Sequence, residues 1–259
     1  MFQNTSHHAN ISQSQNRWCL EIPPSPSSKY RLAQLDDYSG LRRSEFHWNP
    51  PITLRLHARV SAPTIPGTWG FGFWNDPFSV ALGLGGMNQI LPVLPNAAWY
   101  FFASPENYLS FRKDKPSSGF LAAAFSSPRE SPLLLIPELA LFPLLVFRSW
   151  AKRIRAKLGR SISEDSIQLS VDVTQWNDYE IDWKSDKVEF LVNSEPVLIS
   201  RTSPTGPLGL VLWIDNQYAS FKPSGEIKTG VLKSSTPAWM EIEGLEIRHI
   251  NSTHTPISP

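Results

Sequence analysis

The chain lacks several features that would point directly to a class of protein. Its 259 residues include a single cysteine, Cys19, so no intramolecular disulfide can form. There is no H-x-x-x-H pair, no cysteine pair and no EF-hand loop, and we therefore expect neither a metal site nor a cofactor. The net charge of +1 provides no overall attraction to nucleic acid, so we expect no nucleic-acid partner.

The two ends of the chain also lack the marks of export or of stable structure. Residues 1–8 contain no basic stretch followed by an apolar one, so the sequence predicts a cytoplasmic protein without a classical secretion signal. Residues 1–15 are polar, and we expect them to be disordered, together with the tail at residues 251–259. Residues 16–250 are predicted to form one domain, because all-β sandwiches of this length are commonly single domains.

What the sequence does contain is a series of short apolar–polar alternations, which are typical of β-strands. The clearest is Ile52–Val60. Trp176–Trp183 alternates in the same way and continues through the turn Lys184–Lys187 into Val188–Asn193, which predicts a hairpin. Further strands are expected at residues 18–22, 30–38, 69–74, 98–103, 108–112, 167–173, 209–214 and 238–250. Because strands far outnumber helical periods, the predicted fold class is an all-β sandwich or jelly roll.

Three segments interrupt this pattern. Residues 79–97 and 113–132 are rich in Gly, Pro, Ser and Ala and are interpreted as loops, either ordered or mobile. Leu133–Phe147 is almost wholly apolar, yet too short and too often broken by proline to span a bilayer. Arg148–Arg160, which follows it, predicts an amphipathic helix that ends near Gly159. Its expected apolar side is Phe147, Trp150, Ile154 and Leu158, and its expected basic side is Arg148, Lys152, Arg153, Arg155 and Lys157.

This helical insertion, residues 130–160, has three interpretations. It could be a lid over the sandwich, or a contact between two copies of the chain. It could also lie on a membrane surface through residues 133–160, with its arginines meeting anionic head groups, which would make the protein membrane-associated.

Several motifs together resemble the family-16 glycoside hydrolases of the concanavalin-A-like superfamily, which include laminarinases, lichenases and agarases. Ile52–Val60 followed by Pro66–Trp74 is similar to the family's strand, G-x-W loop and strand ending in F-W. Trp176–Trp183 and Glu189–Asn193 are similar to its Trp–Tyr–Trp strand and hairpin, and Trp239–Arg248 to its closing strand. The resemblance implies a jelly-roll sandwich of two antiparallel sheets with a concave groove. It also leaves open a structural calcium on the convex side, held by backbone carbonyls and one aspartate.

The sequence departs from this family at the strand that carries its catalysis. The family pattern is E-x-D-x-x-E, whose carboxyl groups lie on one face about 5–5.5 Å apart for retaining hydrolysis. The equivalent strand here, Ala98–Asn107, holds only Glu106, which sits past a proline in a turn. Glu180–Asp182 and Glu241–Glu243 belong to other strands and are interpreted as charged residues of a solvated face. The retaining chemistry is therefore expected to be absent, and whether the chain is an enzyme stays open.

Aromatic and amide side chains remain as candidates for the groove. Tryptophan rings stack on flat, partly apolar ligands, and Asn, Asp and Gln bind polar groups at their rim. The residues expected to bind a ligand are Trp74, Asn75, Trp99, Ser104, Trp213, Asn216 and Gln217. Three carboxylates, Asp76, Asp215 and Glu106, are candidates for acid–base chemistry.

These residues support three hypotheses. In the first, the protein binds a carbohydrate-like or other ring-containing ligand without hydrolysing it. In the second, it is an enzyme with relocated carboxylates, in which Asp76 and Asp215 form an acid–base pair acting on a glycan. In the third, the apolar insertion covers the groove, and the protein binds or modifies an apolar lipid or terpenoid at a membrane surface.

Overall fold

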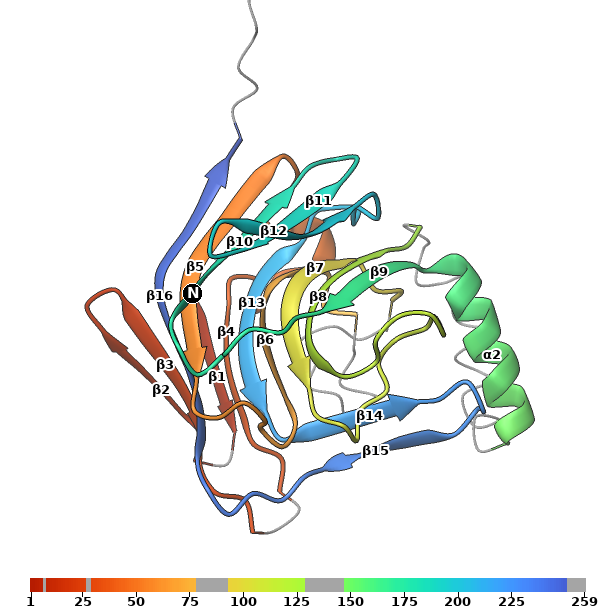
Figure 1. Ribbon diagram of the computed structural model, residues 1–259, viewed down its shortest axis with the longest axis horizontal. Helices are drawn as coiled ribbons and strands as arrows, with labels where there is room; N and C mark the ends of the chain where they lie inside the picture. Colours follow the sequence, from red (N-terminus) through yellow and green to blue (C-terminus); the bar gives the residue numbers. More distant parts are fainter. Residues whose placement is uncertain (7, 27–28, 78–92, 129–146, 251–259) are drawn as a thin grey trace, which may run out of the picture.

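The computed structural model describes residues 1–6, 8–26, 29–77, 93–128 and 147–250, and these form two facing antiparallel sheets (Figure 1). Sheet A has the order β1 (Phe2–Ser6), β4 (Leu32–Asp36), β13 (Gly209–Asp215), β6 (Thr68–Trp74), β7 (Ala97–Ala103), β8 (Gly119–Ser126) and β9 (Ser163–Gln168). Sheet B has the order β12 (Glu195–Ser200), β11 (Val188–Val192), β10 (Asn177–Trp183), β5 (Ile52–Val60), β16 (Ala238–His249), β3 (Arg17–Ile22) and β2 (Asn10–Ser14). β14 (Gln217–Phe221) and β15 (Ile227–Val231) form a separate hairpin, and η1 (Arg43–Glu45) is a short 3-10 helix. The all-β jelly-roll sandwich expected from the sequence is confirmed.

The core between the sheets follows from the period-two alternation of the strands. In β5, every second residue from Ile52 to Val60 is buried. In β6, Trp69, Phe71 and Phe73 point inward, and the Phe71 ring lies 5.1 Å from that of Tyr179 on the facing sheet. The same alternation sends the intervening residues of β6 to the outer face of sheet A, where the candidate site lies.

Most expected strands are present, but the one expected at residues 108–112 is not, and the one expected at residues 167–173 lies earlier, as β9. β5, β6 and the β10–β11 hairpin lie where the sequence predicts them. Residues 108–112, expected to be a strand, carry only an isolated bridge from Tyr108 to Ser220. The antiparallel partner of β7 is instead β8, within the segment 113–132 that was interpreted as a loop. β8 was missed because Gly119 and the run Ala122–Ala124 have low β-propensity, although small side chains suit a strand buried on both faces.

The N-terminal residues are a second correction, because they pair at sheet edges where disorder was expected. β1 pairs with β4 at the edge of sheet A, and β2 pairs with β3 at the edge of sheet B. The side chain of Asn4 adds a hydrogen bond of 2.6 Å from its Nδ2 to Asp36 Oδ2. An edge strand offers unpaired N–H and C=O groups, so a polar segment can pair there without an apolar face of its own. The expectation for residues 251–259 lies outside the described residues.

The predicted helix is present as α2 (Arg148–Ser161), but its buried side differs from the expected one. Phe147 and Trp150 are 58% and 39% exposed, whereas Arg155, assigned to the solvated side, is buried. Arg155 donates from Nε to the carbonyl of Phe221 (2.8 Å) and from Nη2 to that of Ser110 (2.7 Å). The guanidinium satisfies these loop carbonyls while its stem packs against apolar atoms, and simple apolar spacing does not reveal this. Within the described ranges, no helix is long and apolar enough to cross a membrane.

The docking of β1 generates a testable prediction. Substituting Asn4→Ala removes one of three side-chain donors to Asp36 Oδ2, the others being Gln34 and Ser39. We expect a loss of about 1–2 kcal/mol in the free energy of unfolding, measured by urea denaturation. Asn10→Ala in exposed β2 is the matched control and should change stability little. Equal effects of the two substitutions would show that β1 does not depend on this contact.

Candidate functional site

Three tryptophans from three neighbouring strands meet on the outer face of sheet A. Trp74 ends β6, Trp99 lies in β7 and Trp213 lies in β13. The Trp74 and Trp213 rings are stacked, with centroids 6.2 Å apart and an interplanar angle of 5°. Trp99 fits against both, at 5.7 Å from Trp74 and 5.4 Å from Trp213. We call these three residues the Trp cluster. The structure thus brings together all three tryptophans that the sequence proposed for the groove.

Two glycines in β6 make room for this cluster. Gly70 is paired with Trp213 on one side, and Gly72 with Trp99 on the other. A Cβ on Gly70 would lie 2.6 Å from the Trp213 ring, and one on Gly72 would lie 2.6 Å from the Trp99 Cα. Gly72 also has φ +148°, a conformation that side chains other than glycine rarely adopt. The alternation Gly70-Phe-Gly-Phe-Trp74 therefore builds a floor without side chains between two indole rings.

The cluster is largely enclosed and differs in hydrogen bonding from one ring to the next. Trp74 and Trp99 are 8% and 9% exposed, and Trp213 is partly exposed. Trp74 Nε1 donates to Tyr38 Oη (2.8 Å), and Trp213 Nε1 donates to Thr68 Oγ1 (2.9 Å). Trp99 Nε1 is buried without a hydrogen-bond partner. The indole with the best access to an incoming molecule is therefore that of Trp213.

Most side chains packed around the Trp cluster are apolar, although β4 places Gln34 opposite Trp213 and Asp36 opposite Val211 on the same face. β7 presents Ala97, Trp99, Phe101 and Ala103 to this face. The residues packed around the Trp cluster are Tyr38, Phe46, Leu94, Phe101, Leu121, Ala123, Phe125, Ile162 and Val211. A face with this lining can stack against a ring, but β7 supplies no nucleophile to it.

Asp76 is the unusual polar group beside the cluster. It lies two residues beyond Trp74, has φ 45° and is 1% exposed. Neither carboxyl oxygen has a hydrogen-bond partner. The Arg43 guanidinium instead donates to the backbone oxygens of Asn75 (2.9 Å) and Asp76 (2.6 Å). A buried polar group without a partner and with a strained backbone is characteristic of a functional position.

Burial governs the protonation of Asp76. Desolvation raises the pKa of its carboxyl group from 3.8 to about 7, against the opposing effect of the nearby Arg43 charge. Near neutral pH the group therefore exists as both carboxylic acid and carboxylate. As an acid it can donate a hydrogen bond, and as a carboxylate it can accept two or more.

Asp215 lies at the opposite end of β6 from Asp76, which corrects the expectation of an acid–base pair. Asp215 is opposite Thr68, and its Oδ1 accepts from the Thr68 hydroxyl at 2.8 Å. Burial raises the pKa of Asp215 to about 7, although the hydrogen bonds from Thr68 lower it. The backbone of β6 runs about 20 Å, at ~3.3 Å per residue, from Thr68 beside Asp215 to Trp74, which precedes Asp76 by two residues. Glu106, the third candidate carboxylate, is exposed in the turn that follows β7. In the same turn the Ser104 N–H donates to the Gly67 carbonyl, so this turn lies near Asp215 and not near Asp76.

The four other predicted binding residues hold loops together. Asn75 accepts from the Asn96 N–H and donates to the Leu94 carbonyl, which joins the two ends of the segment between them. The remaining three have these contacts: Ser104 Oγ accepts from Gly67 and Asn107, Asn216 bonds Lys29, Arg31 and Leu232, and the Gln217 N–H donates to Asp215. These four side chains thus make their hydrogen bonds within the protein. Tyr38 and Arg43, which border the site, were not predicted because they come from a loop distant in the sequence.

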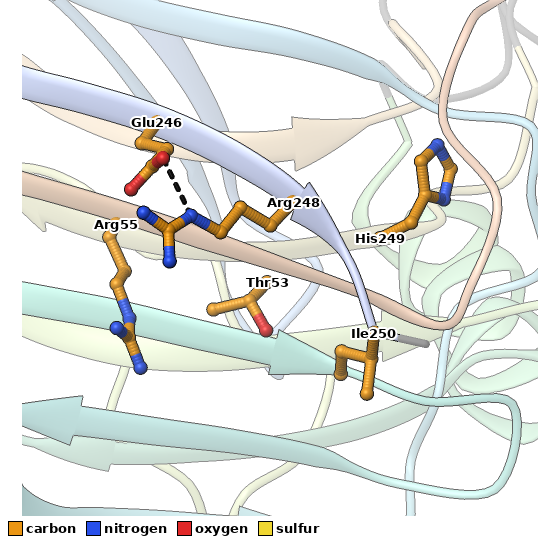
Figure 2. A pocket seen from close by; sticks show the side chains of 6 residues that line it. All are labelled: Thr53, Arg55, Glu246, Arg248, His249 and Ile250. Carbon is orange, nitrogen blue, oxygen red and sulfur yellow. Dashed lines mark ion pairs between the residues drawn. The ribbon is translucent and has the colours of Figure 1, made fainter. Parts of the chain in front are cut away.

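A shallow pocket on the other side of the sandwich, the outer face of sheet B, has a different character. Its lining residues are Thr53, Arg55, Glu246, Arg248, His249 and Ile250 (Figure 2). Glu246 and Arg248 form an ion pair of 2.6 Å, and Arg55 pairs with Glu180 at 2.9 Å. The first pair lies within β16 and the second joins β5 to β10, so these exposed charges neutralise one another as they ordinarily do on a solvated sheet face. In the described part of the chain, no cluster of three His, Cys, Asp or Glu side chains is arranged to hold a metal ion.

Comparisons with known proteins find similar folds and no close relative. No family model and no curated protein matches the chain. It is similar to a glycoside hydrolase family 16 endo-glucanase from Bacteroides ovatus, at 7% identity and a TM-score of 0.45, over 93% of this chain and 85% of that one. It is also similar to the laminarinase catalytic domain from Thermotoga maritima, at 10% identity and a TM-score of 0.42, over 93% and 81%. A sialidase matches at 7% identity and a TM-score of 0.44 over 96% of this chain, which spans only 17% of the sialidase. The family that the sequence motifs resemble thus recurs among these structures.

The raised pKa of Asp76 predicts how stability depends on pH. Between pH 4 and 7 the folded state retains a proton that the unfolded state has released, so Asp76 makes stability fall as pH rises through about 7. From pH 5 to pH 8 its contribution is roughly 3 kcal/mol. Asp76→Asn should remove this part of the fall and stabilise the protein at pH 8, measured by urea denaturation at both pH values.

The control for this measurement is Asp186→Asn, which makes the same change in charge at an exposed position. It should leave the difference between pH 5 and pH 8 unchanged. Asp215 shifts in the same direction, so Asp76→Asn is expected to reduce the fall and not to abolish it. A fall equal to that of the unmodified protein would mean that Asp76 is ionised in the folded state at pH 5.

Proposed function

We propose that the protein binds a ring-containing, carbohydrate-like ligand at the Trp cluster without hydrolysing it by the family's retaining mechanism. The observation that carries this proposal is the convergence of Trp74, Trp99 and Trp213 on one face, beside the unpartnered carboxyl group of Asp76. Indole rings pack against the apolar faces of sugar rings, and a carboxyl group binds their hydroxyls.

Each part of the cluster has a distinct role in this proposal. Trp213, the most exposed of the three rings, provides the stacking surface, and its N–H is held by Thr68 so that the ring keeps its orientation. Asp76 and the Trp99 N–H are the groups that gain a partner when the ligand binds. Trp74, bonded to Tyr38, supports the other two rings from behind.

The positions of the carboxylates support the proposed absence of retaining hydrolysis. Retaining enzymes hold two carboxyl groups about 5–5.5 Å apart, and inverting enzymes about 6.5–9.5 Å apart. Asp76 and Asp215 lie instead at opposite ends of β6, whose backbone is about 20 Å long at ~3.3 Å per residue. Asp36 is a second buried carboxylate near Asp76, but it already accepts hydrogen bonds from Asn4, Gln34 and Ser39, which leaves Asp76 as the group that can bind a hydroxyl.

A second candidate function is favoured by the apolar lining. Phe101, Phe125, Leu121 and Val211 surround the indoles, and this lining suits a lipidic ring system such as a sterol or terpenoid as well as a sugar. In this case Asp76 would bind the single hydroxyl of such a molecule. The two candidates share the site and differ in how many polar groups the ligand carries.

Calorimetric titration with defined ligands tests the proposal. The probes are a β-1,3-linked glucose hexamer, a β-1,4-linked glucose hexamer and cholesterol in mixed micelles. Trp213→Ala should weaken binding roughly tenfold or more, because it removes the exposed stacking surface. Trp213→Phe keeps a ring over Gly70 and should retain most of the affinity. It therefore shows whether a loss of binding in Trp213→Ala reflects the missing ring and not misfolding. Trp176→Ala, just before β10 on the opposite sheet, is the control and should bind as the unmodified protein does.

The outcomes separate the candidates. Binding of a hexamer that depends on Trp213 supports the carbohydrate-like ligand, and binding of cholesterol alone replaces it with the second candidate. Release of new reducing ends from either hexamer would contradict the absence of hydrolysis. Binding that is equal in the unmodified protein and Trp213→Ala would overturn the assignment of the site.

A further inference from the structure

Helix α2 presents one side to the protein and the other to solvent (Figure 1). Its inner side is fixed by buried Ala151 and Arg155 and by Leu158, which packs against the apolar cluster beneath it. The tip of the β14–β15 hairpin touches its first turn, because a Cβ on Gly225 would lie 2.2 Å from the Arg148 carbonyl. The helix is therefore held in one orientation, and its outer side is determined.

The outer side is strongly basic. The 14 residues of α2 contain Arg and Lys at six positions and no acidic residue, in a chain whose net charge is only +1. Arg155 is used internally, where it bonds the carbonyls of Phe221 and Ser110. Arg153, Lys157 and Arg160 lie on the exposed side. Positive charge is thus concentrated on the outer side of α2, although the chain as a whole is nearly neutral. Such a patch attracts an anionic partner.

Exposed aromatic residues lie beside these cations. Phe147 is 58% exposed and Trp150 39% exposed, which places two large apolar side chains in water at the start of the helix. The Arg153 guanidinium carbon lies 5.4 Å from the centre of the Trp150 ring. An indole at a polar boundary, flanked by arginine and lysine, matches the chemistry of the lipid head-group region. Nucleic acid would engage the cations but would leave Phe147 in water.

We propose that Phe147, Trp150, Arg153, Lys157 and Arg160 form a docking surface for an anionic lipid bilayer. The cations meet lipid phosphates, and the two aromatic side chains enter the boundary between head groups and acyl chains. Arg155 contributes by holding the helix against the sandwich, so that the exposed side faces outward. This docking is independent of the ligand proposed for the Trp cluster, and the two can fail separately.

Vesicle co-sedimentation of the full chain tests this surface. The vesicles are pure phosphatidylcholine, and phosphatidylcholine with phosphatidylglycerol at three to one. We expect sedimentation with the anionic vesicles only, decreasing with salt. Arg153→Glu with Lys157→Glu should weaken the partition coefficient about thirtyfold or more, because each cation near an anionic surface contributes about fivefold. Lys29→Glu with Lys233→Glu makes the same charge change at two exposed lysines elsewhere and is the matched control.

The aromatic contribution is tested separately by Trp150→Ser, which keeps every charge. It should reduce sedimentation with anionic vesicles and make the remainder more sensitive to salt. Three results would overturn the proposal: no sedimentation with anionic vesicles, an equal loss in the control pair, or a gel shift of double-stranded DNA that needs Arg153 and Lys157 while vesicles stay unbound. The last result would assign the surface to nucleic acid.

Discussion

The period-two alternation of β6 is the constraint on which both faces of sheet A depend. One set of its residues, Trp69, Phe71 and Phe73, fills the core between the sheets. The other set, Gly70, Gly72 and Trp74, forms the floor and one wall of the candidate site. A shift of one residue in register would exchange the two sets and place the glycines in the core. The same hydrogen-bonded pairing thus secures the sandwich and positions the neighbouring Trp99 and Trp213.

This arrangement explains why the sandwich can form whatever chemistry the outer face of sheet A supports. The floor of the site is built by backbone pairing and by side chains that pack, and neither requires a carboxylate on β7. Trp99 and Phe101 of β7 add apolar surface to this face. Function follows from the site and not from the fold. The carboxyl group of Asp76 beside this face has no hydrogen-bond partner, and its burial makes it able to donate or accept near neutral pH.

Helix α2 shows the same separation between pattern and use. Its basic residues look alike in the sequence, yet Arg155 donates hydrogen bonds to two backbone carbonyls, whereas Arg153 lies over the exposed Trp150 indole. A buried arginine must find hydrogen-bond acceptors, and here the segment around Ser110 and the end of β14 supply them. The helix is thereby attached to the sandwich through the hydrogen bonds of Arg155, and the aromatic side chains at its N-terminal end are exposed to water.

The local pattern of residues was enough to predict β5, β6, the β10–β11 hairpin, the helix and the sandwich, because alternation and helical spacing are properties of neighbouring residues. It also selected the three tryptophans that meet. Strand β8, whose alanines carry little β-propensity, and the polar edge strands β1 and β2 required the sheet itself, since their stability comes from partners distant in the chain. The same holds for the separation of Asp76 from Asp215 and the burial of Arg155. Distances across a sheet and burial beneath a loop are set by which segments pack together, and no single stretch of sequence contains that information.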